Sequence, residues 1–223
     1  TSADGSLLAS IDDQIGRVVS RESIGHVVLS GHNDSVTSVR FSPDGTHVVT
    51  TSADRTARIW NSQTGELVYT LTGHRDWVRD VSFSPDGAHI VTASDDRTAR
   101  IWDSKSGEMV HVLDGHWDWV NFARFNPDGS QIVTTGADGI ARIWDARSGS
   151  LLQEIINSEN PAAGAKFSAD GAHLLIHGSN RSHYMWPVAD LDNLMVMGCD
   201  YLAHYLAKHP QALQELSACQ NLD

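Results

Sequence analysis

Short apolar runs separated by polar turns follow one another along most of the chain, and this pattern predicts strands. Between residues 36 and 71, β-branched, aromatic and aliphatic residues gather in four runs of five or six residues. Glycine, proline, asparagine, aspartate and serine fill the gaps between the runs, as they do in turns. The runs predict strands at residues 36–41, 47–52, 56–61 and 67–71.

The same arrangement returns every 42 residues. The segment Phe-Ser-Pro-Asp-Gly begins at Phe41 and at Phe83, and closely related segments begin at Phe125 and Phe167. Aligning residues 31–72 with 73–114 gives about 26 identical positions. Four strands without a helix in such a repeat are typical of one β-propeller blade. Strands that are apolar on both faces fit this fold, because blades stack face to face.

The repeated motifs resemble those of the WD40 family. Gly-His opens the repeats at residues 31, 73 and 115, and the first two of these carry a Ser-x-Asp turn. Two repeats close with Trp-Asp, at Trp102-Asp103 and Trp144-Asp145. The resemblance covers residues 1–188 and implies an all-β propeller. The blades would be a partial one at 1–30 and further ones at 31–72, 73–114, 115–156 and 157–188.

About four and a half blades fall short of the seven or so that usually close a ring in this family. We therefore expect the chain to be the C-terminal part of a longer protein. The alternative is an open arc that closes by pairing with another subunit.

Residues 189–223 leave the repeat and predict a short α-helical tail, with Asp190 as its N-cap. The tail would pack on the propeller edge or bind a partner helix. The run Asp190–Leu194, with Gly198–Leu202, resembles the tail of bacterial WD40 proteins in which the propeller follows a STAND-type signalling NTPase. That resemblance implies a sensor propeller in a signalling or defence protein, joined to upstream domains. This chain itself contains no phosphate-binding loop motif.

Composition and charge further restrict the class of protein. The formal net charge is −12, which argues against nucleic acid because phosphates require a basic surface. No apolar run approaches the roughly 20 residues of a membrane span, and the first residues do not form a signal peptide. The two cysteines, Cys199 and Cys219, are too few for a disulfide framework. A cytoplasmic protein without a cofactor is therefore expected.

Each regular repeat contains a serine, a histidine and an aspartate, the residue types of a hydrolase triad. A catalytic set is needed once, whereas this one recurs in successive blades. The family resemblance implies a structural chain of hydrogen bonds from the tryptophan indole to serine, then to histidine and aspartate. The members would be His32, Ser52, Asp54 and Trp60; His74, Ser94, Asp96 and Trp102; and His116, Asp138 and Trp144, with Gly136 in place of the third serine.

The repeats at the two ends of the chain lack most residues of this hydrogen-bonding set. The last blade has Ser158, Gly178 and Asn180 at three of the four positions, so packing should hold it more than polar contacts do. In the first blade, Val19 stands near the tryptophan position. His173 and His177 would lie about 13 Å apart along a strand, too far to share one ion, so no metal site is expected.

The family resemblance also implies where a partner binds. WD40 proteins bind proteins and peptides mostly across the top face, formed by the Gly-His and Ser-x-Asp loops. The turns on the opposite face are nearly the same in every repeat and so carry little information. The Gly-His loops vary: Trp77 and Trp119 occupy equivalent positions where the preceding blade has Ser35, and Trp117 lies beside the second.

We predict a partner-binding site on that face, with the indoles as anchors beside charged groups. The charged members would be Arg75, Asp76 and Asp118, bordered by Arg55 and Arg97. Alternatively, the indoles cover a neighbouring loop and the two bordering arginines bridge to acids of the next blade.

The expected function is protein–protein interaction without catalysis, as the recognition region of a larger signalling NTPase protein. A stand-alone scaffold for complex assembly is the alternative. A propeller hydrolase is the remote one, because no blade carries an extra acid, base or metal set.

Overall fold

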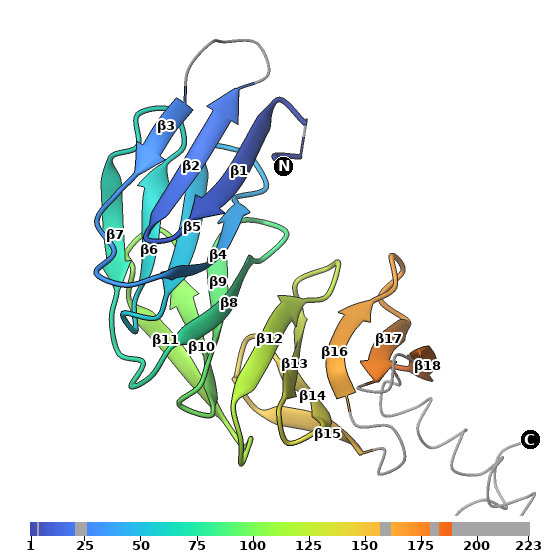
Figure 1. Ribbon diagram of the computed structural model, residues 1–223. Coiled ribbons are helices and arrows are strands. Elements are labelled where there is room, and N and C mark those ends of the chain that lie inside the picture. Colours follow the sequence, from blue (N-terminus) through green and yellow to red (C-terminus); the bar gives the residue numbers. More distant parts are fainter. Residues whose placement is uncertain (4, 21–25, 157–161, 179–182, 189–223) are drawn as a thin grey trace, which may run out of the picture. The chain divides into compact units, whose positions relative to one another are not determined.

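Eighteen strands and no helix make up the part of the chain that the structure describes. The structure is a computed structural model that describes residues 1–3, 5–20, 26–156, 162–178 and 183–188 (Figure 1). The strands form five antiparallel sheets, which we number 1 to 5 in chain order. The prediction of an all-β fold is therefore confirmed for these residues. The predicted helical tail lies outside them.

Three central sheets have four strands each, and the first and last sheets have three. Sheet 1 contains β1 (Leu7–Asp12), β2 (Ile15–Ser20) and β3 (His26–Leu29). Sheet 2 contains β4 (Val36–Phe41), β5 (His47–Ser52), β6 (Ala57–Asn61) and β7 (Leu67–Leu71). Sheet 3 contains β8 (Val78–Phe83), β9 (His89–Ser94), β10 (Thr98–Asp103) and β11 (Met109–Asp114). Sheet 4 contains β12 (Val120–Phe125), β13 (Gln131–Gly136), β14 (Ile140–Asp145) and β15 (Leu151–Ile156). Sheet 5 contains β16 (Ala162–Phe167), β17 (His173–Gly178) and β18 (His183–Pro187).

The strands predicted for residues 36–71 agree with sheet 2, except that β6 begins one residue later than expected. In sheet 2 the pairing of β6 with β7 ends at Ala57 and Leu71, whereas in sheet 3 the equivalent threonine, Thr98, still pairs with Asp114 and belongs to its strand. Strands in sheet 2 follow chain order, so β4 and β7 form its two edges.

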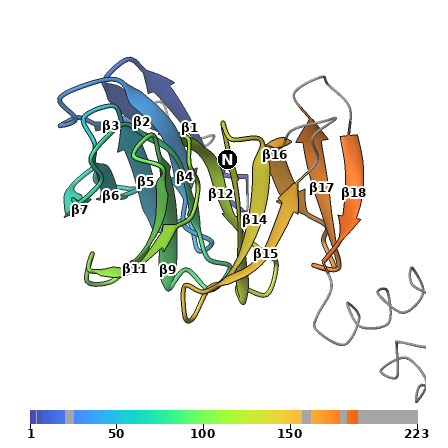
Figure 2. The ribbon, with the colours of Figure 1, turned by 90° about the horizontal axis from the view of Figure 1, so that it is seen from below.

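Neighbouring sheets contact one another mainly through their first strands, β4, β8, β12 and β16 (Figures 1 and 2). We call these the inner strands. The layers between sheets are apolar, and a tryptophan from the later sheet fills each central layer. Trp60 packs with residues of sheet 1, Trp102 with residues of sheet 2, and Trp144 with residues of sheet 3. Each of these indoles is only 2% exposed. Burial of such large rings accounts for much of the stability of the stack.

Each inner strand ends in a tight turn. We call the end of the sheets where these turns lie the turn end. In the first, the amide of Gly45 donates to the carbonyl of Ser42, and Gly45 has a φ of 72° that favours glycine. The turns of neighbouring sheets also touch, since a Cβ at Gly87 would lie 3.5 Å from Pro43. The opposite end, which carries the Gly-His loops, is the loop end.

The chain divides into two compact units, Thr1–Trp186 and Pro187–Asp223. Nearly all described residues belong to the first unit, and every site discussed below lies within it. Among the described residues, no helix is long and apolar enough to cross a membrane.

Candidate functional site

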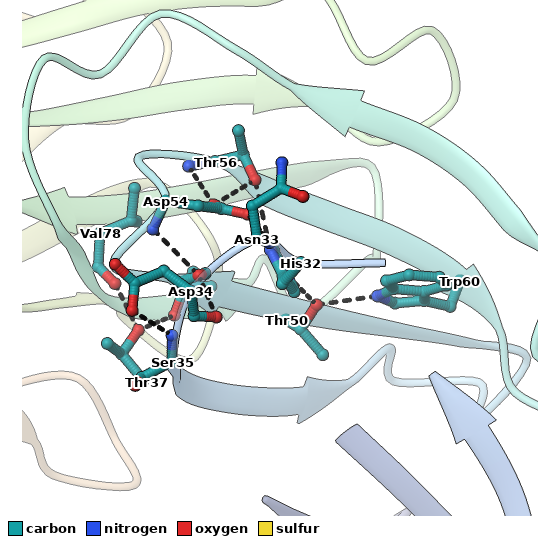
Figure 3. A network of polar contacts seen from close by, with 12 residues as sticks. His32, Asn33, Asp34, Ser35, Thr37, Thr50, Asp54, Thr56, Trp60 and Val78 are labelled. Atoms are coloured by element: carbon teal, nitrogen blue, oxygen red, sulfur yellow. Dashed lines mark hydrogen bonds and ion pairs between the residues drawn. The ribbon is translucent and has the colours of Figure 1, made fainter. Parts of the chain in front are cut away.

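A chain of buried polar groups joins the loop end of sheet 2 to its tryptophan (Figure 3). Nδ1 of His32 lies 2.9 Å from a carboxylate oxygen of Asp54, and Nε2 lies 2.7 Å from the Thr50 hydroxyl. The indole N–H of Trp60 donates to the same hydroxyl over 2.8 Å. All four groups are satisfied if Thr50 donates to Nε2 and Nδ1–H donates to Asp54.

The same chain occurs in the next two sheets with nearly the same distances. Histidine, threonine, aspartate and tryptophan contribute in each case. The sets are His74, Thr92, Asp96 and Trp102 in sheet 3, and His116, Thr134, Asp138 and Trp144 in sheet 4. The structure thus brings together the predicted histidines, aspartates and tryptophans.

The predicted role of Ser52 and Ser94 in this chain is wrong, because a threonine two residues earlier supplies the hydroxyl. Ser52 stands at the end of β5, where its hydroxyl donates to the carbonyl of Asp34 and accepts from the amide of Asp54. Two strand residues span about 6.6 Å, so Ser52 holds the loop while Thr50 reaches the indole. The replacement of this serine by Gly136 in sheet 4 therefore leaves the chain complete.

Within the described residues, the two end sheets do not contain this network. In sheet 5, Ile176 stands at the position of the threonine and Trp186 is 37% exposed. The predicted substitutions at residues 158 and 180 lie outside the described residues. In sheet 1, Leu8 pairs with Val19 as Val48 pairs with Trp60, so Val19 does occupy the tryptophan position.

Charge in the network follows from burial and hydrogen bonding. Desolvation lowers the pKa of His32 and of His74, although the paired carboxylates oppose this, so the imidazoles are neutral at pH 7. Burial opposes the ionisation of Asp54, but hydrogen bonds from Thr56, Asn33 and His32 outweigh it and lower its pKa to about 2. The carboxylate is therefore charged and fully engaged.

This arrangement cannot attack a substrate, although it contains a hydroxyl, an imidazole and a carboxylate. Thr50, Thr92 and Thr134 are completely buried, and each hydroxyl already holds an indole and an imidazole. A nucleophile needs a path to its substrate. The geometry therefore supports a structural role for the repeated set.

The loop end presents three exposed tryptophans. Trp77 and Trp119 are each 49% exposed and Trp117 is 65% exposed, in contrast to the buried indoles of the blades. The carboxylates of Asp76 and Asp118 accept hydrogen bonds from the amides of Trp77 and Trp119, which fixes the loop tips. We call Trp77, Trp117 and Trp119, with Arg75, Asp76 and Asp118, the indole patch.

One indole of the patch also packs on its own protein. The guanidinium of Arg79 lies 5.0 Å from the ring centre of Trp119. Arg79 is held by Asp95 through two hydrogen bonds, one of them 2.7 Å long. The prediction from sequence missed this pair. A signal was present, because the other complete repeats have Thr37 and Asn121 at the first position and alanine at the second.

Arg55 and Arg97 lie at the loop end with φ values of 72° and 71°, and both are exposed. Within the described part of the chain, neither side chain has an ion pair or hydrogen bond. The structure therefore does not favour the alternative that they bridge to acids of the next blade.

Metal binding finds no support among the described residues, which contain no group of three suitable ligands. His177 contacts His183 rather than His173, with 2.8 Å between their Nδ1 atoms.

Comparison with known proteins agrees with the geometry. The family model "WD domain, G-beta repeat" matches residues 25–61, 65–103 and 107–145. The chain is 43% identical over 72 residues to an uncharacterised WD repeat-containing protein of Synechocystis, covering 31% of this chain and 21% of that protein. It is 50% identical over 42 residues to protein Mut11 of Chlamydomonas reinhardtii, covering 19% and 11%.

A third relative, the guanine nucleotide-binding protein subunit beta-like protein of Encephalitozoon cuniculi, is 37% identical over 68 residues, covering 30% and 20%. The chain thus spans no more than about a fifth of the length of these relatives. Its repeated blades, the hydrogen-bond chain in three of them and a family match over more than half of its residues together place this chain in the WD40 repeat family.

Proposed function

We propose that the protein binds a protein or peptide partner through the indole patch, without catalysis. The observation that carries the proposal is the exposure of three tryptophans on neighbouring loops of one end. The blade tryptophans are 2% exposed, whereas those of the patch are 49% to 65% exposed. Exposed aromatic clusters are uncommon on isolated domains and typical of interaction sites.

The patch has the composition of a recognition site. Trp77 and Trp117 supply large apolar surfaces that a partner can desolvate. Arg75, Arg55 and Arg97 supply exposed cations around them, and the carboxylates of Asp76 and Asp118 keep one oxygen each beyond the bond to their own loop. Trp119 is partly covered by Arg79, which pre-orders its ring and lowers the entropy lost on binding.

The wider context is also a proposal. The tail resemblance supports a recognition region within a larger bacterial signalling or defence NTPase protein, located in the cytoplasm. A stand-alone scaffold is the second candidate, and the names of two relatives, a G-protein beta-like protein and a dynein assembly factor, are compatible with it. A phosphate-binding loop encoded upstream of Thr1 would favour the first of these.

The test is affinity capture from the native host with the full chain and two triple variants. The first is Trp77→Ala/Trp117→Ala/Trp119→Ala. The matched control removes three similarly exposed apolar side chains from outer strands, Leu67→Ala/Met109→Ala/Leu152→Ala. Circular dichroism and the unfolding midpoint establish that all three proteins are folded.

We expect one protein to be recovered with the wild type and the control, and lost with the indole variant. Recovery of the same protein with all three would place the binding surface elsewhere and contradict the proposal.

A further inference from the structure

A second candidate site lies at the turn end, away from the indole patch. A cavity of about 1130 Å³ opens there between the inner strands. Its walls are largely aromatic rings and prolines from successive repeats. They include Phe41, Phe83, Phe122, Phe125, Phe167, Pro43, Pro85 and Pro127. A concave, mostly apolar cavity of this size is typical of sites for small molecules.

The charge of this cavity is opposite to that of the protein. The chain has a formal net charge of −12, yet among the described residues none of the side chains that line the cavity is acidic. Three of them are cationic, Arg40, Arg124 and Lys166. Such local segregation of charge concentrates ions of the opposite sign.

The repeat explains why the cations converge. Arg40, Arg124 and Lys166 occupy the same position in β4, β12 and β16, directly before the last phenylalanine of each strand. Sheet 3 has Ser82 at this position. The cationic residues therefore lie at equivalent positions of the inner strands, three residues before the turn prolines Pro43 and Pro127 in the case of Arg40 and Arg124.

One carboxylate only partly balances this charge. Asp80 of β8 is buried and accepts two hydrogen bonds from Arg124, the longer of them 3.0 Å. Arg40 approaches the same carboxylate no closer than 3.7 Å. Lys166 is exposed and makes no hydrogen bond or ion pair within the described residues. Two of the three cations thus share one buried anion, and Lys166 has no ion pair within the described residues.

Arg40 in particular stands in a positive environment. Burial lowers its pKa, the neighbouring Arg124 guanidinium lowers it further, and Asp80 compensates only in part. Nearly half of its side chain is accessible, so a ligand can reach it. An additional anion at this point would relieve the repulsion between the two guanidinium groups.

We propose that this cavity binds a small organic anion with an aromatic or aliphatic body. Its carboxylate, sulfonate or phosphate group pairs with Arg40 and Lys166, and its body rests on the phenylalanine and proline side chains. Guanidinium and ammonium groups bind such anions through charge-assisted hydrogen bonds. The site is independent of the proposed partner-binding patch, because the two lie at opposite ends of the sheets.

The test uses two fluorescent probes with similar aromatic bodies, titrated into the full chain. One is the anion 8-anilinonaphthalene-1-sulfonate, and the other is the uncharged N-phenyl-1-naphthylamine. We expect saturable binding of the anion. Lys166→Gln and Arg40→Gln should each weaken it about three- to tenfold, because a charge-assisted contact is lost, and should leave the neutral probe unchanged.

Two further variants separate the contributions. Phe122→Ala removes a partly exposed ring from the wall and should weaken both probes. Arg147→Gln removes an exposed cation outside the cavity and should change neither.

Three results would overturn the proposal: no saturable binding of the anion, equal loss with Arg147→Gln, or no loss with Lys166→Gln and Arg40→Gln. The triple indole variant serves as a last control, since it should bind both probes as the wild type does. That result keeps failure here distinguishable from failure of the proposed function.

Discussion

Sheets 4 and 5 are neighbours formed by the same sequence repeat, yet their equivalent tryptophans differ in burial and in hydrogen bonding. In sheet 4, Trp144 is 2% exposed and its N–H donates to Thr134, which also contacts His116. In sheet 5, Ile176 replaces the threonine and Trp186 is 37% exposed. An indole can be buried deeply only where its N–H has a partner. Sheet 5 also has three described strands where sheet 4 has four, so β18 has no described neighbour equivalent to β15. Deep burial of the tryptophan thus accompanies both the threonine partner and the fourth strand.

Acid should have the largest effect, because it protonates buried groups in the networks of sheets 2, 3 and 4. The folded-state pKa of His32 and His74 lies below the ordinary 6.5, and that of Asp54 and Asp138 lies near 2 instead of 3.8. The unfolded chain therefore binds more protons than the folded one below pH 6.5. The free energy of unfolding should fall as the pH drops below 6.5, and fall more steeply below 3.8.

Urea unfolding at pH 7, 5, 4 and 3, followed by tryptophan fluorescence, measures this dependence. The Asp54→Asn variant should lose part of the slope below pH 4. A free energy of unfolding that stays constant or rises on acidification from pH 6.5 would contradict the assignment of neutral imidazoles.

Truncation of the two tryptophans should come next in size. Trp144→Ala is expected to lower the free energy of unfolding by about 3–5 kcal/mol, because it leaves a large cavity between sheets 3 and 4. Trp186→Ala, at a partly exposed ring, should cost less than half as much. Equal losses in urea unfolding would show that exposure in the folded protein does not separate the two sheets.

Removal of the central hydroxyl tests the network without a change of volume. Thr134→Val strands the indole N–H and an imidazole nitrogen, and should cost about 2–4 kcal/mol. Ser94→Ala, which removes only the hydroxyl that holds the loop, should cost about 1 kcal/mol. The same unfolding assay decides between them. If the serine variant were the less stable one, the serine would be the more important hydroxyl after all.

A smaller effect than that of Thr134→Val is expected from a change at the serine position of sheet 4. Gly136→Ser would give sheet 4 the serine of sheets 2 and 3, but a Cβ there would lie 2.6 Å from Nδ1 of His116 and 2.9 Å from the carbonyl oxygen of Trp119. We expect a loss of about 1–3 kcal/mol from this crowding. Gly136→Ala is the matched control and should show a similar loss. A gain in stability with serine alone would contradict this.

The strands could be predicted well from the sequence, because turn residues recur at the same positions of each repeat and separate its strands. The histidine, aspartate and tryptophan of each network followed from the resemblance to the WD40 family, through motifs that recur in register. The hydroxyl was misassigned because Thr50 and Ser52 point to the same side of one strand, and only the structure shows which reaches Trp60. The cationic cavity escaped notice because its members lie one per repeat, 42 or more residues apart. The turn end, which the sequence marked as uninformative, therefore carries the second candidate site.

The two ion pairs made by Arg79 and Asp80 of β8 affect which strands can pair correctly during folding. Residues 31–72 and 73–114 are identical at about 26 of 42 positions, and such similar repeats can exchange strands and misassemble. Arg79 meets a carboxylate only if β9 and the loop after it come from its own repeat, because Ala53 and Ala137 stand at the equivalent of Asp95. Arg124 likewise meets a carboxylate only if β8 is the strand beside it, because Ser38 and Phe122 stand at the equivalent of Asp80. Both pairs are complete only in the native order of the repeats, so they favour that order over arrangements in which similar blades exchange strands.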